Sequence, residues 1–324
     1  CVGVVHTSFV SWGSEQRQAS VLDAFEGVTP AEVEAVLRLR QDIERSVPPD
    51  DLEMLLTEHV GGDLALLRMH RYRNIMPPQE CLAEILKARR AIDSDAVCRE
   101  ILSQRLSLNM LPGTAELHAA SWENNPWVGV DNDGNVVSYE RFGTIEPDRL
   151  LTEFPLEQYV QWETYRWEAR GMLLNLLSLR TKRVVGYTNV IDVSGGTAAH
   201  RKLMPYLKEF VSGDAQNSQA PMNDGGTFLV RAGRAATMIF NLAKSTFFTK
   251  RQQDSTFLLR GNPFETSERF RARFESLALP RDVGGELATG AGGHCCVGVP
   301  PLPSMRDEDG LLQLYNSRNP DLFQ

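Results

Sequence analysis

The sequence predicts an α/β protein in which a helical N-terminal lobe packs on a lobe built around a mostly parallel sheet. Four short apolar runs between residues 135 and 261 are rich in β-branched residues, and a helical pattern fills each gap between them. The region from Pro30 to Asp93 instead carries apolar residues at three- and four-residue spacing. Alternating strands and helices are typical of a parallel sheet, whereas a run of helices indicates a separate helical layer.

Four amphipathic segments make up the predicted N-terminal lobe. They cover residues 30–46, 50–60, 63–73 and 77–92. Pro77 and Pro78 stand where a helix can begin, because proline fits the first turn. We therefore assign residues 1–29 to an N-terminal extension and residues 30–102 to the helical lobe.

The second lobe is predicted to span residues 130–287. Its strands are expected at residues 135–143, 183–196, 227–233 and 255–261. Its helices are expected at residues 156–179, 197–211, 235–250 and 267–279. A linker at residues 103–129, which lacks a steady period, leads into this lobe, and a glycine- and proline-rich tail at residues 288–324 follows it.

The composition limits the classes of function. The 324 residues carry a formal net charge of -8, which argues against nucleic acid as a partner because an acidic surface repels phosphate. No apolar run approaches the roughly 20 residues needed to cross a bilayer, and the first residues lack the basic start of a signal peptide. The five cysteines have neither metal-site nor redox spacing, which favours reduced thiols. We expect a cytoplasmic protein that meets membranes only peripherally.

The sequence offers little for catalysis. It contains no Gly-x-Ser-x-Gly elbow, no His-Glu-x-x-His motif, no phosphate-binding loop and no dinucleotide fingerprint. Gly195 and Gly196 follow a predicted strand but lack the third glycine that lets a backbone cradle pyrophosphate. His200 has no partner in sequence that would make it a general base, and Cys295 and Cys296 beside one histidine are a weak metal signal. We expect neither an enzyme nor a bound cofactor or metal.

One segment, "MIFNLAKSTFFTK" at residues 238–250, is apolar and locally basic in an acidic chain. Residues 225–253 carry five basic side chains and no acidic one. On a helix, the large apolar side chains spread over more than a single stripe, so part of them can face something other than the core. Two interpretations stay open. The segment either lies against an anionic membrane surface, or is a helix buried in an α/β layer with solvated basic residues at its ends.

The order of the predicted elements, together with four motifs, resembles the CRAL-TRIO family of lipid-binding and phosphatidylinositol transfer proteins. The likeness runs from about Leu66 to Leu287, and its motifs are "LALLRMHRYRN", "GVDNDGNVVSYERFG", "NVIDVSG" and "LALPRDVGGEL". The resemblance implies a helical lobe packed on an α/β lobe whose sheet floors an apolar pocket for one lipid. It also implies that the helix after the third of these strands acts as a gate at membranes.

The segment at residues 238–250 takes the place of this gate. A gate must cover acyl chains when closed and tolerate a bilayer when open, so it needs apolar bulk on several sides and cations toward the head groups. The residues expected to serve in it are Met238, Ile239, Phe240, Leu242, Lys244, Phe247, Phe248, Lys250 and Arg251.

The resemblance also suggests residues for the lipid site. Arg73 matches an arginine of the inositol phosphate site in phosphoinositide-binding members, with a plain surface arginine as the equal alternative. Most of that signature is absent, since the family's Tyr-Pro-Glu-Arg becomes "APMN" at residues 220–223. Strict alternation on the strand at residues 183–196 puts one set of side chains toward the pocket. The lipid-binding candidates are Arg73, Ser138, Tyr187, Asn189, Ile191 and Asn223.

The sequence therefore predicts a protein that binds one lipid and exchanges or presents it at membranes without covalent chemistry. Phospholipid is the favoured ligand, and the contact with an anionic membrane is expected to be transient. One alternative is a carrier of a non-phospholipid hydrophobe, such as a sterol or a tocopherol-like or retinoid-like molecule. Another is an adaptor that docks on membranes or proteins without transferring lipid. A monomer is favoured, with no nucleic-acid partner.

Overall fold

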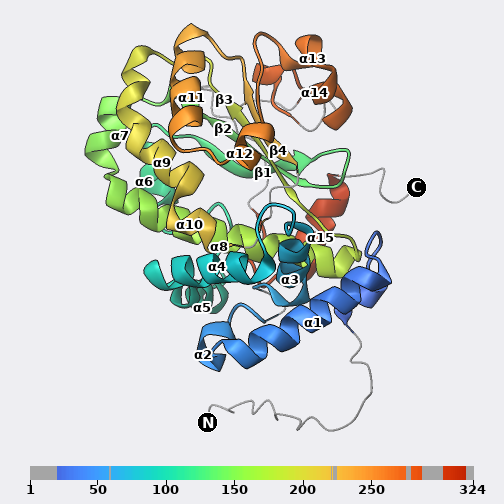
Figure 1. Ribbon diagram of the computed structural model, residues 1–324. Coiled ribbons are helices and arrows are strands. Elements are labelled where there is room, and N and C mark those ends of the chain that lie inside the picture. The colour runs from blue at the N-terminus through green and yellow to red at the C-terminus, as the bar shows by residue number, and fades with distance from the viewer. Residues whose placement is uncertain are drawn as a thin grey trace, which may run out of the picture.

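Two lobes meet along one long helix in the computed structural model of this protein (Figure 1). The structure describes residues 20–57, 60–219, 221, 225–274, 279–286 and 302–318. Helix α8, Leu156–Thr181, runs between a helical layer at the N-terminal end of the chain and the sheet of the second lobe. Eighteen of its 26 residues are buried, since it is covered on both sides.

The N-terminal lobe is helical, as predicted. Its elements are η1 Val21–Ala24, α1 Pro30–Ser46, α2 Pro49–Leu52, α3 Gly62–Arg71, α4 Pro78–Ala91 and α5 Ser94–Gln104. Helix α1 begins where the sequence predicts because Thr29 and Glu32 form a capping box around Pro30. The helix predicted at residues 50–60 is wrong beyond α2, where turns replace it up to the start of α3.

A five-stranded sheet forms the centre of the second lobe. Its order is β1 Asn124–Val130, β2 Val136–Arg141, β3 Tyr187–Asp192, β4 Gly226–Val230 and β5 Thr256–Leu258. Strands β2 to β5 pair in parallel, and β1 pairs antiparallel with β2. The predicted α/β fold with a mostly parallel sheet is confirmed.

The stretch predicted as a linker, residues 103–129, contains regular structure. Helix α6, Thr114–Ala119, and most of β1 lie in it. The sequence hides β1 because Asn124, Asn125 and Pro126 are poor strand formers. They are tolerated here because β1 is an edge strand with a register shift between Asn125 and Gly129.

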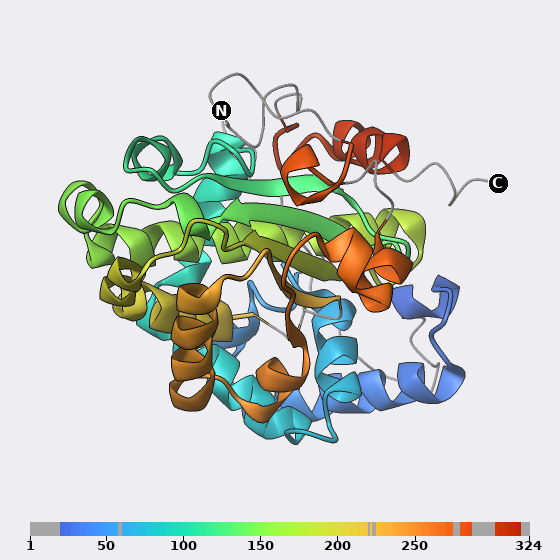
Figure 2. The same ribbon diagram turned by 90° about the horizontal axis from the view of Figure 1, so that it is seen from above.

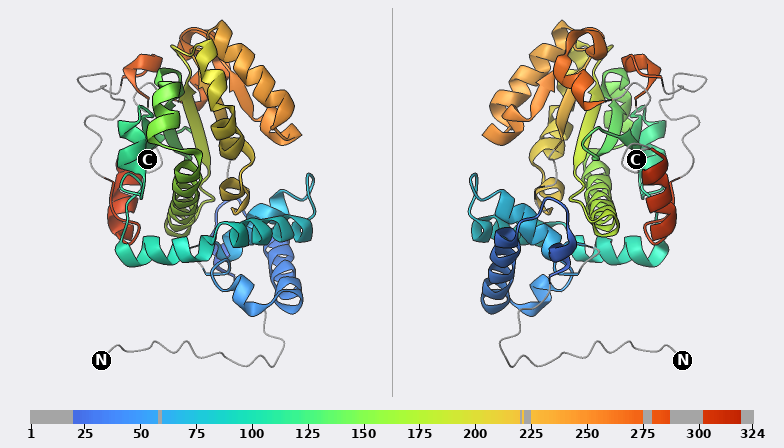
Figure 3. Two further views of the ribbon diagram at one scale, coloured as in Figure 1. Left: turned by 90° about the vertical axis from the view of Figure 1, so that its left-hand side faces the viewer. Right: turned by 90° about the vertical axis from the view of Figure 1, so that its right-hand side faces the viewer.

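The helices of the second lobe cover both faces of the sheet. They are η2 Phe142–Thr144, α7 Pro147–Glu153, η3 Ala198–Leu203, α9 Met204–Ser212, α10 Asp214–Asn217, α11 Arg234–Thr246, α12 Lys250–Asp254, α13 Pro263–Thr266, α14 Glu268–Arg273, η5 Arg281–Val283 and α15 Glu308–Ser317. Figure 2 shows this lobe from above, and Figure 3 shows α11 and α15 on opposite sides of the molecule.

The gate helix predicted at residues 235–250 is two helices, which corrects the sequence interpretation. Helix α11 ends at Thr246, and α12 begins at Lys250. The break arises at Thr249, whose side chain caps α12 through a box with Gln252. We call residues 234–254 the gate segment.

A buried carboxylate joins the lobes. Glu168 on α8 is 1% exposed and accepts hydrogen bonds from Cys98 at 3.1 Å and from Ser218 at 3.0 Å. Ser94 also donates to it, and Arg89 of α4 forms an ion pair with it at 3.3 Å. Since an unpaired buried charge is costly, these donors fix the N-terminal lobe to α8.

We predict that Arg89→Met destabilises the protein by about 3–5 kcal/mol, because it leaves Glu168 buried without its cation. Arg90→Met is the matched control, since Arg90 is an exposed neighbour whose ion pair with Asp51 lies at the surface. Urea unfolding of both variants checks this. Equal stability of the two variants would contradict the role given to Glu168.

Candidate functional site

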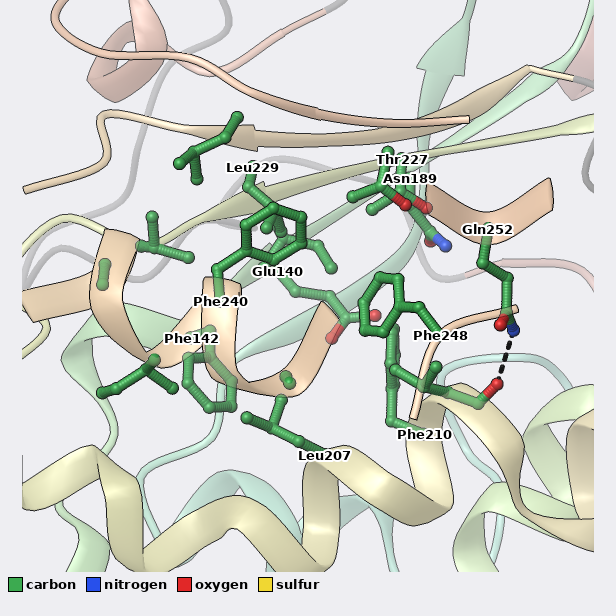
Figure 4. Close-up of a pocket in the computed structure, with 18 of the residues that line it drawn as sticks. Glu140, Phe142, Asn189, Leu207, Phe210, Thr227, Leu229, Phe240, Phe248 and Gln252 are labelled. Atoms are coloured by element: carbon green, nitrogen blue, oxygen red, sulfur yellow. Dashed lines mark hydrogen bonds between the residues drawn. The ribbon is translucent and has the colours of Figure 1, made fainter. Parts of the chain in front are cut away.

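A hollow lies between one face of the sheet and the helices α9, α11 and α12 (Figure 4). Its cavity volume is about 110 Å³, and the space free of atoms is about 1090 Å³ when the open mouth is included. Ligand pockets for small molecules commonly measure ~300–1,000 Å³. The closed cavity is therefore small, and a large ligand requires the open side to widen.

The floor of the hollow begins with a row of polar side chains that runs across four parallel strands. In-register pairing places Ser138 beside Asn189, Asn189 beside Thr227, and Thr227 beside Thr256. The Ser138 hydroxyl donates to Asn189 Oδ1 at 2.6 Å. We call these four residues the polar row. All but Ser138 line the hollow directly.

Two residues further along, the floor becomes apolar on β3, β4 and β5, while β2 contributes the carboxylate Glu140. Because side chains alternate, the next residues on the same face are Glu140, Ile191, Leu229 and Leu258. Figure 4 shows the polar Asn189, Thr227 and Gln252 on one side of the hollow and the apolar Phe142, Leu207 and Phe240 on the other. The hollow is thus amphipathic along its length.

The gate segment forms the roof of the hollow, and it carries apolar side chains on its inner and on its outer face. Ile239 and Ala243 are buried, and Phe240 and Phe248 line the hollow. Met238 and Leu242 point outward and are 56% and 46% exposed. The inner face thus covers the hollow while the outer face meets solvent, so the segment is not a fully buried helix, and its contact with a membrane stays a prediction.

Polar contacts fix the two ends of the gate segment. Three residues before its start, Arg231 forms an ion pair with the buried Asp192, and the Arg231 Nε atom lies 3.1 Å from Asp192 Oδ1. At its end, Arg251 stacks on Tyr72 of the N-terminal lobe at 4.4 Å, and Gln252 Nε2 donates to the Val211 carbonyl oxygen at 2.6 Å. The middle of the segment is held by apolar contacts.

A buried network of charged side chains from α8 and β2 lies beside the hollow. Arg166 is 1% exposed and donates to Glu140 at 2.7 Å and to Glu163 at 2.8 Å. Tyr159 donates a further hydrogen bond to Glu163. Burial raises the pKa of Glu163 and that of Tyr159. Glu140, which faces the hollow, is therefore a paired carboxylate and not a free one.

The predicted lipid-binding residues fall into three groups. Asn189 and Ile191 line the hollow, and Ser138 and Tyr187 are buried on the same sheet face. Arg73 lies on the surface, donates to the His70 carbonyl oxygen at 3.0 Å and does not line the hollow. Asn223 lies outside the described residues.

The predicted basic residues of the gate differ in their surroundings. Lys250 forms an ion pair with Asp254 at 2.7 Å, and Arg251 stacks on Tyr72. Lys244 is half-buried and has no carboxylate partner within the described part of the chain. Phe247 is half-buried at the end of α11.

Several residues of the hollow escaped the sequence analysis. Trp167, Phe210 and Leu207 line it from α8 and α9, and Thr227 and Leu229 line it from β4. Alternation along β4 could have identified the last two, since it places them on one face. The helical residues carry no such signal, because their facing depends on how α8 and α9 pack.

No group of histidine, cysteine, aspartate and glutamate side chains in the described ranges is arranged to hold a metal ion. Among the helices in those ranges, none combines the length and the apolar character needed to cross a bilayer. His200 lines the hollow, and burial lowers its pKa.

Comparisons with known proteins point to one fold. The phosphatidylinositol/phosphatidylcholine transfer protein SFH12 of Arabidopsis thaliana is 24% identical over 174 residues, which are 52% of this chain and 30% of that protein. The match thus spans less than a third of this curated relative. The crystal structure of Sfh5 is similar to this chain, with a TM-score of 0.53 and a sequence identity of 12%. The superposed region covers 90% of this chain and 99% of the Sfh5 chain. No protein-family model matches.

The helical lobe packed on a lobe with a mostly parallel sheet is the architecture that the chain shares with Sfh5. The chain has the CRAL-TRIO fold, and the resemblance to the CRAL-TRIO family is confirmed.

We predict that Arg231→Met loosens the start of the gate segment and lowers the free energy of unfolding by about 2 kcal/mol, because Asp192 loses its cation. Arg234→Met, three residues away and exposed, is the matched control. Hydrogen exchange of the α11 amides should speed up in the first variant alone. Exchange that is unchanged in both variants would refute this anchoring role.

Proposed function

We propose that this protein binds one lipid in the hollow and exchanges or presents it at membrane surfaces, without covalent chemistry. The observation that carries the proposal is the division of α11, whose inner face covers an apolar hollow while its outer face exposes Met238 and Leu242. An exposed methionine and leucine on a roof helix suit insertion into the outer part of a bilayer.

The energetics of an acyl chain support this proposal. Each buried methylene contributes about 0.8 kcal/mol, so ten methylenes contribute about 8 kcal/mol. Opening the roof exposes Ile239 and Ala243, which are the two buried residues of α11 and which line the hollow. An incoming lipid tail replaces those contacts, and the bilayer covers the exposed outer face.

Phospholipid is the proposed ligand class. Its support is the likeness to SFH12, which is described as a phosphatidylinositol/phosphatidylcholine transfer protein. The amphipathic floor agrees with this ligand class. The polar row offers hydrogen-bond donors and acceptors to a head group, and Ile191, Leu229 and Leu258 offer apolar contacts to an acyl chain. We further propose that the protein acts in the cytoplasm as a monomer and binds anionic membranes transiently.

The inositol phosphate site of the resembling family finds little support here. Arg73 is directed to the N-terminal lobe surface and bonded to its own helix end. Gln252 and Ser255 line the hollow near the end of the gate segment as neutral groups that bring no charge to a phosphate. We therefore propose that phosphoinositides are less favoured as ligands than other phospholipids.

Transfer of a fluorescent phosphatidylcholine between vesicles tests the proposal. We predict that Met238→Ser combined with Leu242→Ser slows transfer about tenfold, because each substitution removes apolar surface that would enter the bilayer. Met110→Ser combined with Leu151→Ser is the matched control, since these side chains are also exposed, at 70% and 37%, but lie outside the roof.

Both double variants should retain the thermal stability of the unmodified protein, because all four side chains are exposed. Slower transfer in the roof variant alone supports the proposal. Equal rates of transfer by the two variants would show that the roof does not contact the membrane. A complete lack of transfer by the unmodified protein would contradict the proposed function.

A further inference from the structure

Two arginines stand one turn apart on α8 and are almost equally buried, at 1% exposure for Arg166 and 2% for Arg170. Arg166 is held by two carboxylates. The two terminal nitrogens of Arg170, Nη1 and Nη2, have no hydrogen-bond partner in the described part of the chain. A buried guanidinium without an acceptor is costly, so the difference between these two neighbours calls for a physical reason.

Aromatic rings compensate part of that cost. The Arg170 guanidinium lies 3.7 Å from the centre of the Tyr187 ring and 4.6 Å from the centre of the Trp167 ring. Such cation–π contacts are favourable in a desolvated site. Burial lowers the pKa of Arg170 to about 10, so the side chain keeps its positive charge at neutral pH. The rings hold the cation in place but accept none of its N–H groups.

The position of Arg170 relates it to the hollow. Trp167, on which it stacks, lines the hollow together with Asn189. Tyr187, its other ring partner, precedes Asn189 by two residues on the same face of β3. Along this face the order is therefore Tyr187 with Arg170, then the polar row, then the apolar Ile191. Arg170 does not itself line the hollow, but it stacks on Trp167, which does, and so places a positive charge beyond the polar row.

We propose that the hollow takes an amphiphile with an anionic head group, a carboxylate or a phosphate, whose head lies toward Arg170 and the polar row and whose chain lies over Ile191 and Leu229. This inference rests on the proposed function, because it names the charge and the direction of the ligand in the same hollow.

The charges around the site favour an anion at this end. Arg170 offers N–H donors that lack acceptors, and hydrogen bonds between an arginine and an anion are among the strong ones. Arg166 is not available, since Glu140 and Glu163 occupy it. Glu140 is the carboxylate that faces the hollow, and its pairing with Arg166 at 2.7 Å offsets its repulsion of a second anion.

Two pairs of probes that differ in the head group test the inference by binding titration. They are oleate against methyl oleate, and dioleoyl phosphatidate against dioleoylglycerol. We expect the anionic member of at least one pair to bind about 10-fold to 100-fold more tightly, because one or two charge-assisted hydrogen bonds distinguish the members. The pair that shows the preference identifies carboxylate or phosphate as the head group.

Two variants connect the preference to Arg170. Arg170→Met should reduce it to less than about twofold while binding of the neutral probe continues, and Arg170→Lys should keep most of it because the charge remains. Circular dichroism and thermal unfolding establish that each variant is folded. If Arg170→Met does not fold, the unmodified protein and Arg170→Lys still decide the matter through the two probe pairs.

The outcomes separate this inference from the proposed function. Equal binding of charged and neutral probes by the unmodified protein, or a preference that persists in a folded Arg170→Met, overturns the inference and leaves lipid binding intact. Protection against unfolding by inorganic phosphate alone, as strong as that by phosphatidate, would show a free-anion site and overturn the amphiphile. Binding of none of the four probes would overturn both.

Discussion

The incomplete contact between α11 and the sheet is the feature on which the rest of the structure depends. In an ordinary α/β layer a helix buries a full apolar stripe on the strands beneath it. Here only Ile239 and Ala243 of α11 are buried, and these two border a hollow together with Ala236 and Phe240. The apolar floor is thus covered but not filled, which is the physical condition for exchanging an oily ligand.

The surroundings of the hollow are correspondingly firm. Helix α8 is buried along most of its length, and its residues Arg166 and Glu168 are fixed by ion pairs to β2 and to the N-terminal lobe. The gate segment is different, because Arg231 and Arg251 anchor its ends while apolar contacts alone hold its middle. A rigid floor beneath a roof anchored only at its ends allows opening without unfolding of the lobe.

Local patterns in the sequence were sufficient for much of this architecture. The apolar spacing of residues 30–46 predicted α1 to the residue, since the cap at Thr29 and the proline at its start are local signals. Alternation on β3 placed Asn189 and Ile191 on one face, and both line the hollow. The likeness of four short motifs to the CRAL-TRIO family supplied the location of the gate segment, which periodicity alone did not decide.

Features that depend on tertiary packing could not be predicted in this way. Strand β1 contains asparagines and a proline that only an edge position tolerates. Arg166 and Arg170 look like solvated residues of an amphipathic helix, and their burial becomes evident only when α8 is covered on both sides. Arg73 matched a family pattern in sequence, yet its place on the surface separates it from the hollow.

Native mass spectrometry of the protein purified from cells, followed by organic extraction, tests the central claim most directly. The account predicts a species heavier than the polypeptide by the mass of one lipid, which solvent releases and which incubation with phospholipid vesicles restores. Bare polypeptide alone, both after purification and after incubation with vesicles, would contradict the claim that the hollow under α11 holds a lipid.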